Sequence, residues 1–270
     1  MAKTRDETIN SIRSERKSKR KWIYLIIALI LFLGCLFILN KQITNIWLNV
    51  SYKPQQNRTL SVNDLEKNQR KARNAMVKRV DSKSDKAVDE SVTLKDILNS
   101  GKYYKDVKDN IIGSLYLPTA ADVSLPVLLG GSNQEIQRKN MLVGASTPLS
   151  NMIIGKSTNI VIGAHNMLSH GIMFSNLTDM DYGDYIYLTN GKYIYVYEVY
   201  SKFEVDPDQV EIYDQNQHNK RDIVTLYTCN TDGSKREIIR GELEYKIKNS
   251  KASPKLMKHF NFSKSKKISL

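Results

Sequence analysis

The segment that most restricts the fold is residues 184–199, with the sequence DYIYLTNGKYIYVYEV. Apolar and polar side chains alternate on both sides of Asn190-Gly191, as they do in strands that bury one face. An Asn-Gly pair between two such runs is the strongest short signal for a two-residue hairpin with a type I′ turn. The pattern therefore predicts two antiparallel strands joined by a tight turn.

Other segments in the same part of the chain are also short, apolar and rich in β-branched residues. Strands are expected at 111–118, 123–131, 159–165, 222–228 and 238–247. About seven short strands with few helices indicate an antiparallel barrel or sandwich. Alternation alone does not choose between these two architectures.

Helices are expected mainly before this region. Residues 40–110 are interpreted as a polar stalk or linker, in which Ser61-Val-Asn-Asp64 has capping-box spacing ahead of a helix near 62–80. A shorter helix is expected at 93–99. The C-terminal segment 249–270 carries six lysines and no acidic residue, and it is expected to fray.

A continuous apolar segment, WIYLIIALILFLGCLFIL, occupies residues 22–39. A helix of this length spans roughly 27 Å, close to the hydrocarbon thickness of a bilayer. A cleaved signal peptide is the alternative, but its apolar core is usually shorter and ends at a small-residue cleavage site. An uncleaved anchor is therefore favoured. Basic residues are concentrated in the preceding tail, 1–21, which predicts a cytoplasmic N-terminus and an extracellular remainder of a single-pass membrane protein.

The formal net charge of +13 is unevenly distributed. The flanking segments 1–40, 41–110 and 249–270 carry +5, +6 and +6, whereas residues 111–248 carry −4. The strand-rich region is therefore mildly acidic, which argues against nucleic acid as its partner. The basic flanks suit membrane lipid or anionic cell-wall polymers, with solvated tails as the alternative.

Cys229, at the end of TLYTC, is the only cysteine outside the apolar segment, which contains Cys35. With Cys35 in a bilayer, no disulfide within the chain can form. Exposed thiols oxidise outside the cell, so a thiol that is used chemically is favoured there. The alternative is a small buried core residue, which is where most free cysteines lie.

Two further residues complete a candidate constellation for acyl transfer. His165 directly follows the apolar strand NIVIGA, and its imidazole suits proton transfer. Arg236 follows Cys229 by seven residues, and a permanent guanidinium can stabilise an oxyanion. Arg240 lies on the same face of the expected strand, so alternation does not separate the two arginines. Ordinary rim or surface roles are the alternative for each residue.

Several motifs together resemble the sortases, membrane-anchored cysteine transpeptidases of Gram-positive bacteria. They are IGSLYLP, the ASTPL-type segment, GAHNM around His165, MFSNLTDMDYGDYIYL, EVDPDQV, and TLYTC followed by Arg236. The resemblance runs over residues 111–248 and implies a closed eight-stranded β-barrel. It implies that Cys229 attacks the Thr–Gly bond of an LPxTG-like sorting signal, that His165 is the general acid/base, and that Arg236 stabilises the oxyanion. Thr228 matches a threonine that helps to orient substrate.

The subclass implied by this resemblance is class A, the housekeeping type. The TLYTC form, one N-terminal anchor and no C-terminal span support class A, and residues 90–130 lack the Asp-Pro-aromatic lid motif of pilus enzymes. Class D, a pilus-type sortase, another cell-wall cysteine peptidase and a non-catalytic wall-binding domain are the alternatives. The implied partners are LPxTG-bearing surface proteins and the amine of a lipid II-type peptidoglycan precursor. No cofactor is predicted, although calcium, which some class A members bind, is left open.

Overall fold

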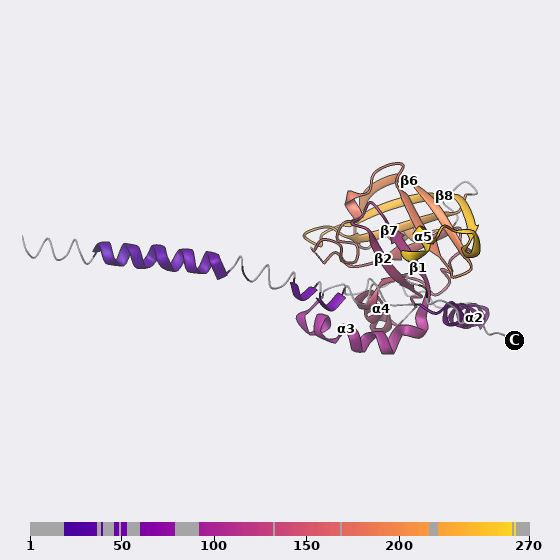
Figure 1. The fold of residues 1–270 in the computed structure, drawn as a ribbon, viewed down its shortest axis with the longest axis horizontal. Coiled ribbons are helices and arrows are strands. Elements are labelled where there is room, and N and C mark those ends of the chain that lie inside the picture. Colours follow the sequence, from indigo (N-terminus) through magenta and orange to yellow (C-terminus); the bar gives the residue numbers. More distant parts are fainter. Residues whose placement is uncertain are drawn as a thin grey trace, which may run out of the picture. The chain divides into compact units, whose positions relative to one another are not determined.

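The computed structural model describes residues 19–36, 39, 46–48, 50–52, 60–78, 92–131, 133–167, 169–215, 221–260 and 262. The chain divides into two compact units, Met1–Trp47 and Leu48–Leu270. Figure 1 shows the elements of both units. Each unit is described separately below.

The N-terminal unit contains the predicted membrane anchor. Residues 19–36 are helical, and the large apolar side chains from Trp22 to Leu36 are exposed. Residues 37 and 38 of the predicted span 22–39, and residues 1–18 of the predicted tail, lie outside the described part. Among the residues described, no helix combines the length and the apolar character needed to cross a membrane.

The second unit is built around a β-barrel (Figure 1). Its strands within the described residues are β1 (Ile111–Leu117), β2 (Val123–Leu128), β3 (Ala145–Ser146), β4 (Asn159–Gly163), β5 (Tyr185–Thr189), β6 (Tyr193–Val205), β7 (Ile223–Cys229) and β8 (Arg236–Lys248). These eight strands close in the order β1-β2-β3-β4-β7-β8-β6-β5. The closed eight-stranded barrel is therefore confirmed, and the two-residue β3 is the strand that the sequence pattern missed.

The expectation of a wholly antiparallel sheet is wrong at two places. Strand β2 pairs in parallel with β3, and β4 pairs in parallel with β7. Parallel neighbours need a long crossover, and both pairs have one. An unpredicted helix, α4 (Gln134–Val143), connects β2 to β3, and the β5–β6 hairpin lies between β4 and β7 in the chain.

The β5–β6 hairpin is confirmed, but its turn differs from the expected type I′. A type I′ turn needs positive φ at both central residues. Gly191 has φ +86°, whereas Asn190 is not among the described residues with positive φ. Instead, the Asn190 side-chain oxygen accepts hydrogen bonds from the backbone N–H groups of Lys192 at 3.0 Å and Tyr193 at 2.9 Å. The side chain of Asn190 therefore holds a wider turn in place.

Helices α2, α3 and α4 lie on the same side of the barrel in Figure 1. Helix α2 (Val62–Lys78) agrees with the predicted 62–80, whereas α3 (Leu94–Val107) is longer than the predicted 93–99. On α2, the Gln69 side chain donates hydrogen bonds to the carbonyls of Ile112 at 2.6 Å and Asn190 at 2.8 Å. Helix α2 is thus fastened to the start of β1 and to the β5–β6 turn.

The C-terminal segment does not fray as expected over its described part. It forms a short 3-10 helix, η4 (Asn249–Lys251), and helix α5 (Pro254–Lys258). Phe260 is 1% exposed, and the His259 ring stacks on Tyr116 with a centroid distance of 4.0 Å. Although its composition is basic, this segment contains enough apolar and aromatic side chains to pack against the barrel. Residues 263–270 lie outside the described part.

The strand directions give the barrel two distinct ends. Cys229, at the end of β7, pairs with Arg236 at the start of β8, and Lys248, at the end of β8, pairs with Tyr193. We call these the Cys229 end and the Lys248 end. Because β8 has 13 residues, its two ends are separated by roughly 40 Å along the strand.

A close approach between β4 and β7 leads to a prediction about stability. A Cβ added to Gly163 would lie 2.2 Å from Cζ of Tyr227. Forcing extra atoms into a packed interior typically costs about 1–3 kcal/mol. We therefore expect Gly163→Ala to lower the free energy of unfolding by about this amount in urea denaturation. A Cβ at Gly131 meets nothing within 4 Å, so Gly131→Ala is the control, and an equal loss in both variants would contradict the explanation.

Candidate active site

Three neighbouring strands bring the predicted site residues together. On one side of β7, Gly163 of β4 pairs with Tyr227, and the backbone N–H of Ala164 donates to the Tyr227 carbonyl at 3.3 Å. On the other side of β7, Cys229 pairs with Arg236. His165, Cys229 and Arg236 therefore lie at the adjoining ends of β4, β7 and β8.

Hydrogen bonds on both sides of His165 tie its loop to the strand that carries Cys229. Thr228 Oγ1 donates to the Ala164 carbonyl at 2.8 Å, and Asn166 Nδ2 donates to the Cys229 carbonyl at 3.1 Å. The His165 carbonyl also accepts from the Phe174 N–H at 3.1 Å, and the histidine is 4% exposed. These contacts restrict the position of the imidazole relative to the cysteine backbone.

Cys229 is a free cysteine and is only partly buried. The apolar side chains of β7 before it, such as Leu226 and Val224, are fully buried. The thiol thus lies where a buried strand reaches the surface. This position differs from that of a cysteine packed in the core, and it leaves the sulfur within reach of a substrate.

Arg236 is fixed by contacts on two sides. Its Cζ lies 5.3 Å from the centroid of the Tyr227 ring, and its Nε donates to the Pro207 carbonyl at 3.4 Å. The arginine is 6% exposed. Residues opposite each other in an antiparallel pair project from the same face, so Arg236 shares a face with Cys229. The planar guanidinium is therefore pre-positioned on the side of the sheet where the thiol projects.

The register separates Arg236 from Arg240, which alternation could not do. Arg240 pairs with Thr225, four residues before Cys229, which is roughly 13 Å along β7. Its Cζ lies 5.1 Å from the Phe203 ring, and burial lowers the pKa of its guanidinium. Its buried Nε has no hydrogen-bond partner among the described residues. Only Arg236 lies directly opposite the cysteine.

Thr228 lies in the interior beside the site. It is 2% exposed, and its hydroxyl is engaged with the Ala164 carbonyl. The geometry makes it a link between β7 and the backbone just before His165. The predicted role of Thr228 in orienting substrate remains a prediction.

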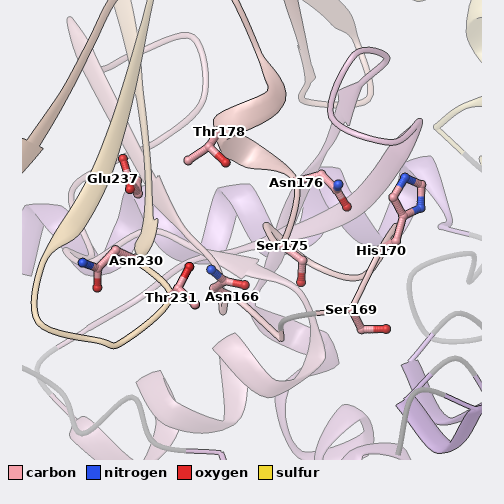
Figure 2. Close-up of a pocket in the computed structure, with 9 residues that line it drawn as sticks. All are labelled: Asn166, Ser169, His170, Ser175, Asn176, Thr178, Asn230, Thr231 and Glu237. Carbon is pink, nitrogen blue, oxygen red and sulfur yellow. The ribbon is translucent and has the colours of Figure 1, made fainter. Parts of the chain in front are cut away.

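A polar pocket of about 340 Å³ lies next to these strand ends (Figure 2). Its lining comes from 166–178, 230–231 and Glu237. Burial, followed by the opposing carboxyl group of Glu204 on β6, raises the pKa of Glu237. Successive side chains alternate across a strand, so Glu237 projects from the opposite face to Arg236. The pocket therefore lies behind the strand ends rather than on the face of the thiol.

Sequence reasoning missed two residues that hold the site together. Asn166 bridges to the Cys229 carbonyl, and the Tyr227 ring contacts the Arg236 guanidinium. The only feature of the sequence that pointed to these two residues was their position, because each lies one or two residues from a candidate catalytic group. Within the described part of the chain, no three His, Cys, Asp or Glu side chains are placed to hold a metal ion.

The hydroxyl of Thr228 leads to a second prediction. In Thr228→Val, the Ala164 carbonyl loses its buried donor, which typically costs about 1–3 kcal/mol. We expect lower stability, together with a lower kcat in any reaction that uses His165 and Cys229, because the link between their backbones is lost. Thr228→Ser retains a hydroxyl and is expected to recover most of both. Full activity of Thr228→Val in a folded protein would contradict this role.

The comparisons with known proteins agree with this geometry. Residues 115–244 match the sortase domain family. A sortase A from Bacillus anthracis is 36% identical over 138 residues, which are 50% of this chain and 61% of that protein. This chain thus spans about three fifths of that relative. A sortase A from Streptococcus agalactiae serotype III is 25% identical over 243 residues, covering 88% of this chain and 91% of that protein.

A solved structure of Listeria monocytogenes sortase A has 31% identity and a TM-score of 0.48, covering 57% of this chain and 99% of that one. The family match over the strand-rich region and the sortase A relatives agree with each other. Residues 115–244 therefore form a sortase domain of the class A-like type.

Proposed function

We propose that this chain is a membrane-anchored cysteine transpeptidase that cleaves LPxTG-like sorting signals between threonine and glycine. It then joins the threonine carboxyl group to the amine of a lipid II-type peptidoglycan precursor. The observation that carries the proposal is the strand register that places His165, Cys229 and Arg236 at three adjoining strand ends. The similarity to sortase A proteins supports the same assignment.

In the first half-reaction, the Cys229 thiolate attacks the carbonyl carbon of the threonine. The resulting oxyanion needs hydrogen-bond donors that are already in place, and the Arg236 guanidinium provides them. As the C–N bond breaks, protonated His165 donates its proton to the leaving glycine amine. The products are a thioester on Cys229 and a released peptide that begins with glycine.

In the second half-reaction, the acceptor amine attacks the thioester carbon. Neutral His165 takes the proton from the attacking nitrogen, and Arg236 again faces the oxyanion. The C–S bond then breaks, which restores the Cys229 thiolate and the protonated His165 and forms a new amide. The chemistry is balanced without a cofactor, because peptide-bond energy is retained in the thioester.

The predicted location follows from the N-terminal sequence. Residues 22–39 carry no charge, and the preceding 21 residues are rich in lysine and arginine. The positive-inside rule then assigns a cytoplasmic N-terminus and an extracellular catalytic domain in the membrane of a Gram-positive cell. This topology supports surface proteins with LPxTG-like signals and membrane-bound wall precursors as substrates. The class A relatives favour the housekeeping role over class D or pilus-type alternatives.

The direct test of the proposal uses the cysteine. We expect Cys229→Ala to abolish transpeptidation of an LPxTG peptide with an amine acceptor, because no thioester can form. In the unmodified protein, mass spectrometry should find the peptide acyl group on Cys229. Cys35→Ala is the matched control and is expected to remain active. Unchanged turnover in Cys229→Ala would refute the proposal.

A second test concerns the two arginines. Arg236→Lys retains the charge but loses the planar set of donors. By analogy with removal of one oxyanion donor, we expect kcat/KM to fall on the order of 10²-fold or more. Arg240→Lys changes a residue opposite Thr225 and is expected to have a much smaller effect on kcat/KM. If Arg240→Lys were the more damaging change, the assignment of Arg236 would be wrong.

A further inference from the structure

Exposed lysines are concentrated at the Lys248 end of the barrel. Lys192 lies in the β5–β6 turn, Lys246 and Lys248 lie at the end of β8, and Lys251 lies in η4. All four are exposed, and none forms a salt bridge with another residue that the structure describes. Their charges are therefore available to an external partner.

An aromatic ring lies among these lysines. The ammonium groups of Lys192 and Lys246 each lie 5.8 Å from the centroid of the Tyr193 ring. Lys248 is the strand partner of Tyr193. Tyrosine and lysine are the residues that proteins use where an apolar layer meets charged headgroups, because each has an apolar stem and a polar tip.

Helix α2 extends this basic surface. Its start lies against the β5–β6 turn, because a Cβ at Gly191 would come within 3.3 Å of the Leu65 side chain. The outer face of α2 carries exposed Lys67, Arg70 and Arg73, for which the described residues provide no salt-bridge partner. The basic surface is hereafter the set Lys67, Arg70, Arg73, Lys192, Lys246, Lys248 and Lys251.

The Cys229 end has the opposite character. Two of its lysines are engaged in ion pairs, Lys202 with Asp181 at 3.0 Å and Lys235 with Asp206 at 3.1 Å. Further carboxylates there include Glu204 and Glu237, which face each other across β6 and β8. The lysines of the two ends thus differ, because Lys202 and Lys235 are paired with carboxylates whereas those of the basic surface have no salt-bridge partner among the described residues.

We propose that the basic surface docks on the anionic phospholipid headgroups of the membrane that holds the N-terminal anchor. The proposal rests on the anchor of the proposed function and adds the surface that faces the lipid. Lys and Arg close to an anionic bilayer each contribute attraction that decays within a Debye length. A mildly acidic Cys229 end would be repelled by the same lipids.

The length of the connecting chain favours lipid as the occupant. Leu48 is already buried in the core of the catalytic unit, nine residues after residue 39 at the end of the predicted span. Nine residues reach at most about 32 Å. Tyr52 is buried beside Asp96 and Arg138, which belong to α3 and α4 on the helical side of the barrel. A tether of this length keeps the point where the chain enters the catalytic unit within that distance of the end of the predicted span.

The test uses the full chain in nanodiscs of phosphatidylcholine alone or mixed with phosphatidylglycerol. We expect backbone amides of 190–193 and 246–251 to exchange hydrogen more slowly in the anionic discs, and this protection to disappear in high salt. Each lysine removed is expected to weaken docking about fivefold. The variant Lys192→Gln/Lys246→Gln/Lys248→Gln should therefore lose the protection.

The matched control is Lys202→Gln/Lys235→Gln, which removes charges at the Cys229 end and should retain the protection. Equal exchange in the two kinds of disc, or equal loss in both variants, would overturn the proposal. Protection by soluble polyphosphate but not by anionic discs would also overturn it and would identify a wall polymer as the partner. Transpeptidation of soluble peptides in detergent reports the proposed function separately, so failure of either can be recognised.

Discussion

The pairing of β7 with β4 on one side and with β8 on the other determines the position of every group in the candidate site. Cys229 faces Arg236 through the antiparallel ladder, and His165 is carried to the same level by the parallel ladder. His165 lies two residues beyond the last pair of the parallel ladder, and the hydrogen bonds made by Ala164 and Asn166 hold it there. A slip of one residue in either ladder would turn a side chain to the other face of the sheet, so the register itself is the main source of precision.

Side-chain contacts near the strand ends stabilise the barrel, and they also help to keep the strands in this register. The Thr228 hydroxyl and the Asn166 amide connect the two strands just where the ladder of backbone hydrogen bonds stops. Gly163 lets the Tyr227 ring lie against β4, and that ring in turn contacts Arg236. The same few contacts therefore stabilise the barrel and orient the candidate catalytic groups. A substitution among them is expected to affect stability and turnover together.

The sequence allowed prediction of the features that depend on local pattern. Alternation located the two hairpin strands, short apolar runs located most of the others, and the strand ends identified His165 and Cys229 as candidates. Features that depend on contacts distant in sequence were not accessible in this way. The two-residue strand β3 is too short for alternation, and the parallel pairings follow from crossovers rather than from composition. Alternation could not distinguish Arg236 from Arg240, because only the register with β7 separates them.

The charges of the chain also show a difference between what the composition predicts and what the fold determines. A net charge of +13 describes the whole sequence, and dividing it among segments already argued against nucleic acid as a partner of the strand-rich region. The fold adds that lysines late in the sequence and cations on α2 meet at one end of the barrel, although 178 residues separate Lys251 from Arg73 on α2. The lysines near the thiol are neutralised by carboxylates, whereas those at the remote end are not. In the proposed docking, this asymmetry would turn the basic surface toward the lipid and the Cys229 end away from it. Charge placement, rather than net charge, is thus the property that bears on how the enzyme is presented to its substrates.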